Sequence, residues 1–142
     1  MKLRSCENSD LEQIKHLLES ETLPSNDIHE HLKNIIIAEE KGIIIGLGAI
    51  EKYNKIGLFR SLVVSKERRR EKIGRAIYQH IEDLSQLMEM QNLYLLTETA
   101  SEYFKKLGFV EITRDEAPDE IKNTKQFSSL CPASAIVMRK TI

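Results

Sequence analysis

A regular stripe of apolar residues in the middle of the chain constrains the fold more than any other feature. The stripe steps by four, four, three and four residues, and its members are Ile73, Ile77, Ile81, Leu84 and Met88. This spacing predicts an amphipathic helix of about four turns, which must bury its apolar face. Apolar runs at 55–65 and 92–99 flank the helix and predict strands. We therefore expect an α/β fold in which helices pack against a sheet.

Other short segments complete the predicted order of elements. Further strands are expected at 1–6, 34–42, 42–54, 109–113 and 134–140, and further helices at 11–18, 28–32 and 100–108. A helical turn is expected after Pro118, and Gly108 is a suitable residue to stop the helix before it. With 142 residues and no repeats or linkers, the chain is predicted to form a single domain, 1–142.

Composition and charge exclude several classes of function. The formal net charge is −1, so the chain as a whole has no electrostatic reason to bind nucleic acid or a membrane. The longest apolar run, 42–50, has about half the length that spans a bilayer. Residues 1–10 lack the apolar core of a signal peptide, so a cytoplasmic location is expected. Cys6 and Cys131 lie far apart without metal-ligand spacing, which favours reduced thiols and no metal site.

Five lysine or arginine side chains crowd the loop 65–74, directly before the central helix. Cations at the N-terminal end of a helix oppose its dipole, so a bound anion would offset them. The helix start also offers unpaired N–H groups, and arginine adds charge-assisted hydrogen bonds. Gly74 would let a ligand approach the backbone closely. The loop therefore predicts a phosphate-binding cradle, with a merely solvated turn as the alternative.

Two other phosphate-binding motifs and a nucleic-acid site fit the sequence less well. The chain has no Walker-type loop, and residues 46–51 lack both the third glycine and the following helix of a dinucleotide-binding turn. A nucleic-acid surface would require a wider basic face with interleaved aromatic residues, whereas this chain has 6% aromatic residues and no tryptophan.

Two motifs resemble the GNAT family of acetyl-CoA-dependent N-acetyltransferases, and the resemblance covers essentially the whole chain. Residues 69–74 resemble the Arg/Gln-x-x-Gly-x-Gly/Ala pyrophosphate signature, with Lys72 in place of the first glycine. Residues 100–109, ASEYFKKLGF, resemble the family's second signature. The resemblance implies the GNAT fold: a mixed, mostly antiparallel sheet of six to seven strands, splayed between strands four and five and flanked by helices on both faces.

The resemblance also implies where acetyl-CoA, the co-substrate, would bind. Pantetheine would pair with the backbone of the fourth strand as an added strand does, and the pyrophosphate would lie on the 69–75 turn. The implied cofactor-binding residues are Leu62, Val63, Val64, Arg69, Arg70, Glu71, Lys72, Ile73, Gly74, Arg75 and Phe104.

Amine acetylation requires removal of a proton from the amine, stabilisation of the carbonyl oxygen and protonation of the leaving thiolate. Many family members use a tyrosine four residues before the glycine of Leu-Gly-Phe as the acid. Here Phe104 holds that position, and Tyr103 stands about 100° away around the helix. Tyr103 is still a candidate acid, or else a boundary tyrosine. Glu51 and Glu98, at strand ends, are candidate bases or simply solvated residues.

Arg60 interrupts an otherwise apolar strand just before the expected acetyl position. A buried guanidinium needs an anionic partner, which is either a substrate carboxylate or an acidic residue of the neighbouring strand. Both interpretations stay open, and Ser61 is a candidate for a further polar contact with the substrate.

A narrower resemblance rests on GLFRSLVV, RDEAP and QFSSLCPASAIVMRK. These segments are similar to the arsenic-resistance N-acetyltransferase branch, and distantly to the acetyltransferase domain of N-acetylglutamate synthase. The similarity implies a small amine acceptor, such as an amino acid, an amino-acid-like compound or an organoarsenical, which attacks directly in a ternary complex. It also implies a possible homodimer, and under it Cys131 would be either a ligand for an arsenical or a buried structural thiol. The alternative is a non-catalytic sensor of acyl-CoA, which the unusual Lys72 and the displaced tyrosine leave open.

Overall fold

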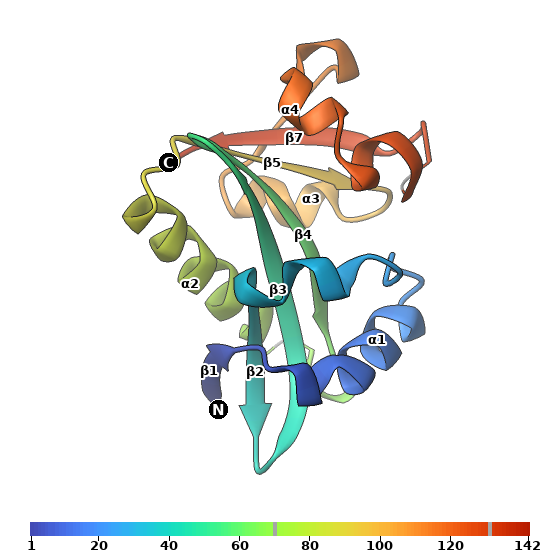
Figure 1. The fold of residues 1–142 in the computed structure, drawn as a ribbon, viewed down its shortest axis with the longest axis vertical. Coiled ribbons are helices and arrows are strands. Elements are labelled where there is room, and N and C mark those ends of the chain that lie inside the picture. The colour runs from blue at the N-terminus through green and yellow to red at the C-terminus, as the bar shows by residue number, and fades with distance from the viewer. Residues whose placement is uncertain (70, 131) are drawn as a thin grey trace. The chain divides into compact units, whose positions relative to one another are not determined.

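The computed structural model describes residues 1–69, 71–130 and 132–142, without the side chains of residues 31, 32 and 130. The strands are β1 (Lys2–Ser5), β2 (Ile35–Glu40), β3 (Ile43–Tyr53), β4 (Ile56–Val64), β5 (Asn92–Thr97), β6 (Val110–Ile112) and β7 (Ile136–Thr141). The α-helices are α1 (Leu11–Ser20), α2 (Ile73–Leu87), α3 (Ser101–Lys106) and α4 (Asp119–Lys122). Short helical segments are η1 (Asn8–Asp10), η2 (Ile28–Asn34), η3 (Lys66–Arg68), η4 (Arg114–Glu116) and the π-helix η5 (Gln126–Leu130). Figure 1 labels the main elements.

The strands form a seven-stranded sheet in the order β1-β2-β3-β4-β5-β7-β6. β4 and β5 are parallel, whereas β1 with β2, β2 with β3, β5 with β7 and β6 with β7 are antiparallel. This confirms the predicted mixed, mostly antiparallel sheet. The β4–β5 ladder runs from Ile56↔Asn92 to Leu58↔Tyr94 and ends there, although β4 continues to Val64 and β5 to Thr97. The pairing of these two strands therefore stops before either strand ends, as expected for strands that are splayed at this point.

The chain divides into two compact units, and each has its own core. The first comprises Met1–Glu51 and Arg60–Leu84, and the second comprises Lys52–Phe59 and Ser85–Ile142. The prediction of one domain over 1–142 stays a prediction.

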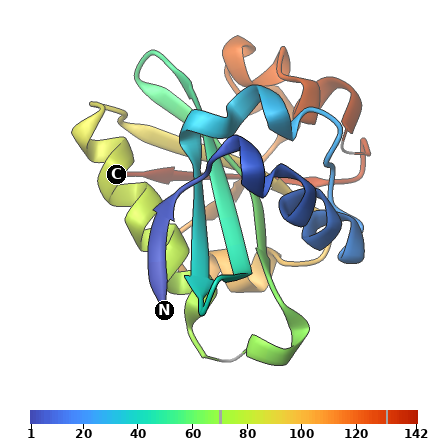
Figure 2. The ribbon, with the colours of Figure 1, turned by 60° about the horizontal axis from the view of Figure 1, so that its bottom comes forward.

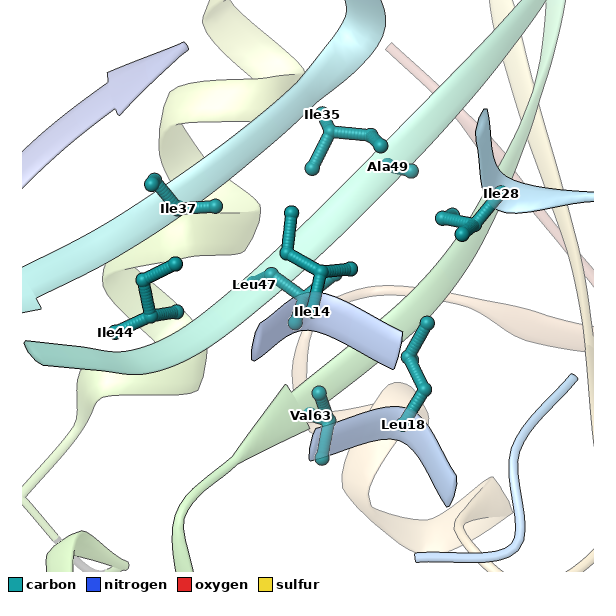
Figure 3. Packing of buried hydrophobic residues seen from close by; sticks show 9 residues of the cluster. All are labelled: Ile14, Leu18, Ile28, Ile35, Ile37, Ile44, Leu47, Ala49 and Val63. Carbon is teal, nitrogen blue, oxygen red and sulfur yellow. The ribbon is translucent and has the colours of Figure 1, made fainter. Parts of the chain in front are cut away.

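Helices cover both faces of the sheet within the first unit. Figure 3 shows the cluster beneath α1, whose buried members are Ile14, Leu18, Ile28, Ile35, Ile37, Ile44, Leu47, Ala49 and Val63. Neighbouring residues of a strand point to opposite faces, so Gly46 faces away from this cluster. There a Cβ atom on Gly46 would lie 3.0 Å from Ile77 Cδ1 of α2 and 3.0 Å from the carbonyl oxygen of Val63. The absence of a side chain at Gly46 thus lets α2, the helix that the apolar stripe predicts, pack closely on β3.

The end of α3 in the second unit follows the prediction that Gly108 stops this helix. Gly108 has φ 102°, which favours glycine. Its N–H donates to the Lys105 carbonyl and the Phe109 N–H donates to the Phe104 carbonyl, both at 3.0 Å. The rings of Phe104 and Phe109 pack edge-on at 6.1 Å between centroids. Together these contacts form a Schellman motif with its hydrophobic contact.

Arg4 joins two carboxylates near the start of the chain. Its guanidinium donates to both Asp10 oxygens, at 2.8 and 2.9 Å, and to Glu39 at 2.7 Å. These hydrogen bonds hold the pKa of Asp10 below its ordinary value of 3.8. The pKa of Asp10 is lower in the folded chain than in the unfolded chain. The Arg4–Asp10 pair therefore stabilises the fold above about pH 4, and this stabilisation is lost as the pH falls further and Asp10 is protonated.

We therefore expect Asp10→Asn to lower the free energy of unfolding at pH 7 but to have little effect well below pH 3. Urea denaturation of both proteins across this range measures the difference. A deficit that persists unchanged in acid would contradict the assigned role of the Arg4–Asp10 pair.

Candidate functional site

The basic loop connects β4 to α2, as Figure 2 shows. It contains the single turn η3, and the Ser65 N–H donates to the Ile45 carbonyl at 2.8 Å, which fixes the loop to β3. The first residues of α2, Ile73 and Gly74, are buried, whereas Lys72 and Arg75 are exposed. A basic segment therefore leads directly into the N-terminal end of a helix of 15 residues, as the sequence predicts.

The arginines of the loop form ion pairs with carboxylates, which the sequence analysis did not predict. Arg68 contacts Glu40 and donates to Glu71 at 2.9 Å. Arg68 holds the pKa values of both carboxyl groups below their ordinary values. Arg69 forms an ion pair with Glu21, at the end of α1. Acidic side chains thus neutralise part of the loop's charge, and an incoming phosphate would compete with them for the guanidinium groups.

The β4 residues expected to contact pantetheine alternate in burial. Val63 is buried in the cluster beneath α1, while Leu62 and Val64 are half-buried. Just before them, Ser61 has φ 63°, in the left-handed region. A non-glycine residue in this conformation costs about 1–3 kcal/mol, and such strain concentrates at functional sites. β4 is therefore distorted at the position where the sequence predicts contacts with the acetyl group and the substrate.

Arg60 lies in a buried cluster of charged residues. Its guanidinium donates to both carboxylate oxygens of Asp27, at 2.6 and 2.8 Å, to Glu51 at 3.0 Å and to Ser61 Oγ at 3.0 Å. Burial lowers the pKa of Arg60, but Asp27 and Glu51 outweigh burial and raise it above its ordinary value. Of the two interpretations that the sequence left open, the structure contains the internal ion pair. The role of Arg60 in binding a substrate carboxylate stays a prediction, and such a carboxylate would compete with Asp27 and Glu51 for the guanidinium.

Residues 31–111 match the family described as Acetyltransferase (GNAT) domain. The chain belongs to the GNAT acetyltransferase family. This agrees with the family that the two sequence motifs resemble. The arsenic-resistance branch stays a prediction.

Two relatives from bacteria match part of the chain. An uncharacterized N-acetyltransferase of Chlorobaculum tepidum is 33% identical over 96 residues, which are 67% of this chain and 61% of that protein. An amino-acid acetyltransferase of Ralstonia nicotianae is 27% identical over 95 residues, which are 66% of this chain and 21% of that protein. The chain thus matches less than two thirds of either relative's length.

Solved structures share the fold. Rv2747 of Mycobacterium tuberculosis, in complex with CoA and NLQ, superposes with a TM-score of 0.85 at 20% identity, over 100% of this chain and 99% of that one. N-acetylglutamate synthase of Neisseria gonorrhoeae, in complex with coenzyme A and N-acetyl-glutamate, superposes with a TM-score of 0.86 at 20% identity, over 99% of this chain and 34% of that one. At this level of identity the similarity demonstrates the GNAT fold.

Lys72 departs from the GNAT signature, and the structure gives a physical reason why glycine suits this position. Lys72 has φ 62°, in the left-handed region that glycine adopts without strain. A side chain there costs about 1–2 kcal/mol. The Ala76 N–H nevertheless donates to the Lys72 carbonyl at 3.1 Å, so the first turn of α2 forms without the glycine. The backbone at Lys72 therefore adopts a conformation that glycine, the signature residue at this position, would adopt without strain. Arg70 lies outside the described residues.

The remaining candidates of the GNAT site differ in environment. Glu51 is buried and paired with Arg60, whereas Glu98 is exposed just after β5. Phe104 is buried, with the rings of Phe59 and Phe109 edge-on at 6.2 and 6.1 Å. Tyr103 is 39% exposed and packs edge-on against Phe104. Their catalytic and cofactor-binding roles stay predictions.

Sequence reasoning did not identify two buried polar residues, Asp27 and Gln126. Asp27 precedes η2 in a stretch that reads as an ordinary helix cap, and its buried partner Arg60 is 33 residues away. Gln126 opens the QFSSL segment, whose burial no periodicity indicates. Among the described residues, no group of three or more His, Cys, Asp or Glu could hold a metal ion. Within the same residues no helix is long and apolar enough to cross a membrane.

Proposed function

We propose that the protein transfers the acetyl group of acetyl-CoA to the amine of a small molecule. The observation that carries the proposal is the segment in which β4 is followed by the basic loop and then by α2. The β4–β5 ladder ends at Leu58↔Tyr94, and the basic loop leads into the N-terminus of α2 with Lys72 in the left-handed conformation. This donor set fits a diphosphate, since unpaired N–H groups at a helix start and adjacent guanidinium groups both favour anions. The family membership supports the same chemistry.

In this proposal acetyl-CoA is a substrate, and the chain orients it. The amine nitrogen forms a bond to the thioester carbon, the carbon–sulfur bond breaks, and the thiolate leaves as CoA. The amine gives up one proton to a base and the thiolate takes one from an acid. Backbone N–H groups of β4 beyond the end of the ladder would donate to the carbonyl oxygen as negative charge develops on it. Glu98 and Tyr103 are the candidate base and acid that have solvent access.

The acceptor is proposed to be an amino acid or an amino-acid-like compound, with an organoarsenical as the arsenic-resistance variant. The amino-acid acetyltransferase of Ralstonia nicotianae and the N-acetylglutamate synthase of Neisseria gonorrhoeae support this class. A cytoplasmic location and a homodimer belong to the same proposal. The runner-up, a non-catalytic sensor of acyl-CoA, would bind CoA without turnover.

Release of free thiol from acetyl-CoA, measured with a panel of amino acids and organoarsenicals, tests the proposed reaction. We expect turnover that depends on the amine. CoA binding without turnover on any amine would favour the sensor, and absence of CoA binding would overturn both functions.

We expect opposite effects on CoA affinity from the two partners of the Arg69–Glu21 pair. Arg69→Glu should weaken CoA binding about tenfold, because a charge-assisted hydrogen bond to phosphate contributes about 1.5–3 kcal/mol. Glu21→Gln should tighten it a few-fold, because Arg69 no longer has to leave a carboxylate. Isothermal titration calorimetry measures both affinities, with Lys105→Glu on the surface of α3 as a control that should change neither. Equal CoA affinity in all four proteins would contradict the assignment of this loop.

A further inference from the structure

The side chains of Arg60 and Ser61 are hydrogen-bonded to each other, although the two residues are neighbours in β4. Arg60 Nε donates to Ser61 Oγ at 3.0 Å, and both residues are buried. In a regular strand, neighbouring side chains point to opposite faces of the sheet and cannot form such a contact. Ser61 has φ 63°, far from the extended conformation of a strand. The hydrogen bond therefore depends on the distorted backbone of Ser61.

The same distortion shifts the alternation of side chains along β4. Glu51 shares a face of β3 with Leu47 and Ala49, because side chains two residues apart point the same way. Leu47 and Ala49 lie in the cluster beneath α1 together with Val63, as Figure 3 shows. Arg60 donates to Glu51 on this face, so Arg60 and Val63 point to the same side although they are three residues apart. β4 thus contains one extra residue between them, which is a β-bulge.

The bulge lies in the part of β4 that would bind the thioester. Ser61 comes three residues after Leu58, where the ladder with β5 ends. A bulge leaves backbone groups of its strand outside the ladder, and bulges are over-represented next to active sites. A hydrogen bond weakens steeply when its donor angle falls below about 120°. The conformation of Ser61 therefore decides how well the adjacent N–H groups of β4 can bind a carbonyl oxygen.

The guanidinium that binds Ser61 is itself fixed in place. Asp27 accepts from it through both carboxylate oxygens, at 2.6 and 2.8 Å, and Glu51 accepts at 3.0 Å. The Arg60 side chain is fully buried. Arginine presents its donors in a rigid planar fork, so the bonds from the two terminal nitrogens also fix the direction of Nε–H. A residue before η2 and a residue of β3 thus hold Arg60 against the bulge.

We propose that Arg60 is a positioning residue for acetyl transfer: its hydrogen bond to Ser61 Oγ holds the bulge in the conformation whose N–H groups bind the thioester carbonyl oxygen as negative charge develops on it. This inference rests on the proposed function. Because Ser61 is not glycine, its conformation is strained, and the hydrogen bond from Arg60 offsets this strain. Arg60 acts through Ser61 and touches neither acetyl-CoA nor the amine. Asp27, Glu51, Arg60 and Ser61 all belong to the first compact unit.

Two replacements of Ser61 test the inference by steady-state thiol release. Ser61→Ala removes the hydroxyl and keeps a Cβ atom, so the left-handed conformation is strained and nothing offsets the strain. Ser61→Gly also removes the hydroxyl but adopts φ 63° without strain. We expect kcat to fall about tenfold in Ser61→Ala and about two- to threefold in Ser61→Gly. The KM values for acetyl-CoA and for the amine should change by less than about twofold in both variants, because the lost interaction is made in the transition state.

Asn54 offers a matched control for backbone strain. It has φ 56° in the exposed turn between β3 and β4. Asn54→Ala strains the chain as Ser61→Ala does and should lower the melting temperature, but it should leave kcat unchanged when activity is measured well below that temperature. An equal fall of kcat in Asn54→Ala and Ser61→Ala would overturn the inference, because loss of stability alone would then explain both.

Arg60→Lys tests the arginine itself, because it keeps a positive charge beside Asp27 but loses the planar fork that reaches Ser61. We expect kcat to fall about tenfold. Introduced into Ser61→Gly, the same replacement should lower kcat by less than about twofold further, because the hydrogen bond that it breaks is already absent. The two Ser61 variants decide the inference by themselves where Arg60→Lys does not fold.

Three other results would overturn the inference in distinguishable ways. If Ser61→Ala and Ser61→Gly lose kcat equally, the hydroxyl acts directly on the reacting groups, and the proposed function stands. If Arg60→Lys raises the KM for the amine and leaves kcat unchanged, Arg60 binds a substrate carboxylate instead. If the unmodified protein releases no thiol with any amine, the proposed function fails and this inference fails with it.

Discussion

Replacement of Arg60 by methionine is expected to lower the free energy of unfolding by about 3–5 kcal/mol, the range measured when one partner of a buried ion pair is removed. The Arg60 side chain is fully buried, and those of Asp27 and Glu51 are 5% and 4% exposed. The variant would leave two carboxylates in the interior without the guanidinium that binds them both. Urea denaturation at pH 7 measures the loss.

Two companion experiments identify uncompensated charge as the cause. Arg60→Met combined with Asp27→Asn and Glu51→Gln should regain at least half of the lost stability, because amides are less costly to bury than ions. The deficit of the single variant should also shrink in acid, because protonation removes the same charges. Both results would be absent if methionine merely packed poorly in the space of the arginine.

Arg4 offers a matched control within the same chain. It also binds two carboxylates, Asp10 and Glu39, but its side chain is 24% exposed. Arg4→Met should cost less than Arg60→Met, because the Glu39 side chain is 26% exposed and Arg4 itself lies at the surface, so that only the Asp10 carboxylate, 9% exposed, is left poorly solvated. Equal losses of stability in Arg60→Met and Arg4→Met would show that burial of the Arg60 cluster does not cause the large loss expected there.

The Arg60 cluster shows which part of a buried ion pair can be predicted from the sequence alone. A single arginine in the apolar strand 55–65 was enough to predict a buried charge with an anionic partner. It was not enough to choose that partner, because Asp27 is 33 residues away from Arg60 and only the folded chain brings the two together. Elements with local signals were predicted correctly, as with the stripe of α2 and the stop at Gly108, because spacing and backbone conformation are encoded in neighbouring residues.

The candidate site was predicted in outline for the same reason. The run of arginines before a helix is visible in the sequence, but the acidic side chains that bind Arg68 and Arg69 come from α1 and β2 as well as from the loop itself. The left-handed conformation of Lys72 was hidden, since a lysine gives no sign of positive φ. Gln126 carries no signal at all, because the burial of its side chain is a property of the packed segment and of nothing in the letters QFSSL.

Gly46 shows how packing supports the proposed site, and its replacement by valine should have the second large effect on stability. A Cβ atom at Gly46 would lie 3.0 Å from both Ile77 Cδ1 and the carbonyl oxygen of Val63. Ile77 is fully buried, so neither neighbour can move without shifting α2 or β4. Overpacking of this kind costs about 1–3 kcal/mol, and we expect Gly46→Val to reach the upper end of that range. Gly46→Ala should cost less.

The consequence for function follows from the geometry of α2. Ile77 lies one helical turn after Ile73, where α2 begins. A side chain at Gly46 that moves Ile77 away from β3 would also move the N-terminal N–H groups proposed to bind the diphosphate. CoA affinity should therefore fall together with stability in Gly46→Ala and Gly46→Val. Ile77→Val removes the methyl group nearest to Gly46. Added to Gly46→Ala, it should restore part of the lost stability and part of the lost CoA affinity. A double-mutant cycle that gives strictly additive losses would show that Gly46 and Ile77 do not act through this contact.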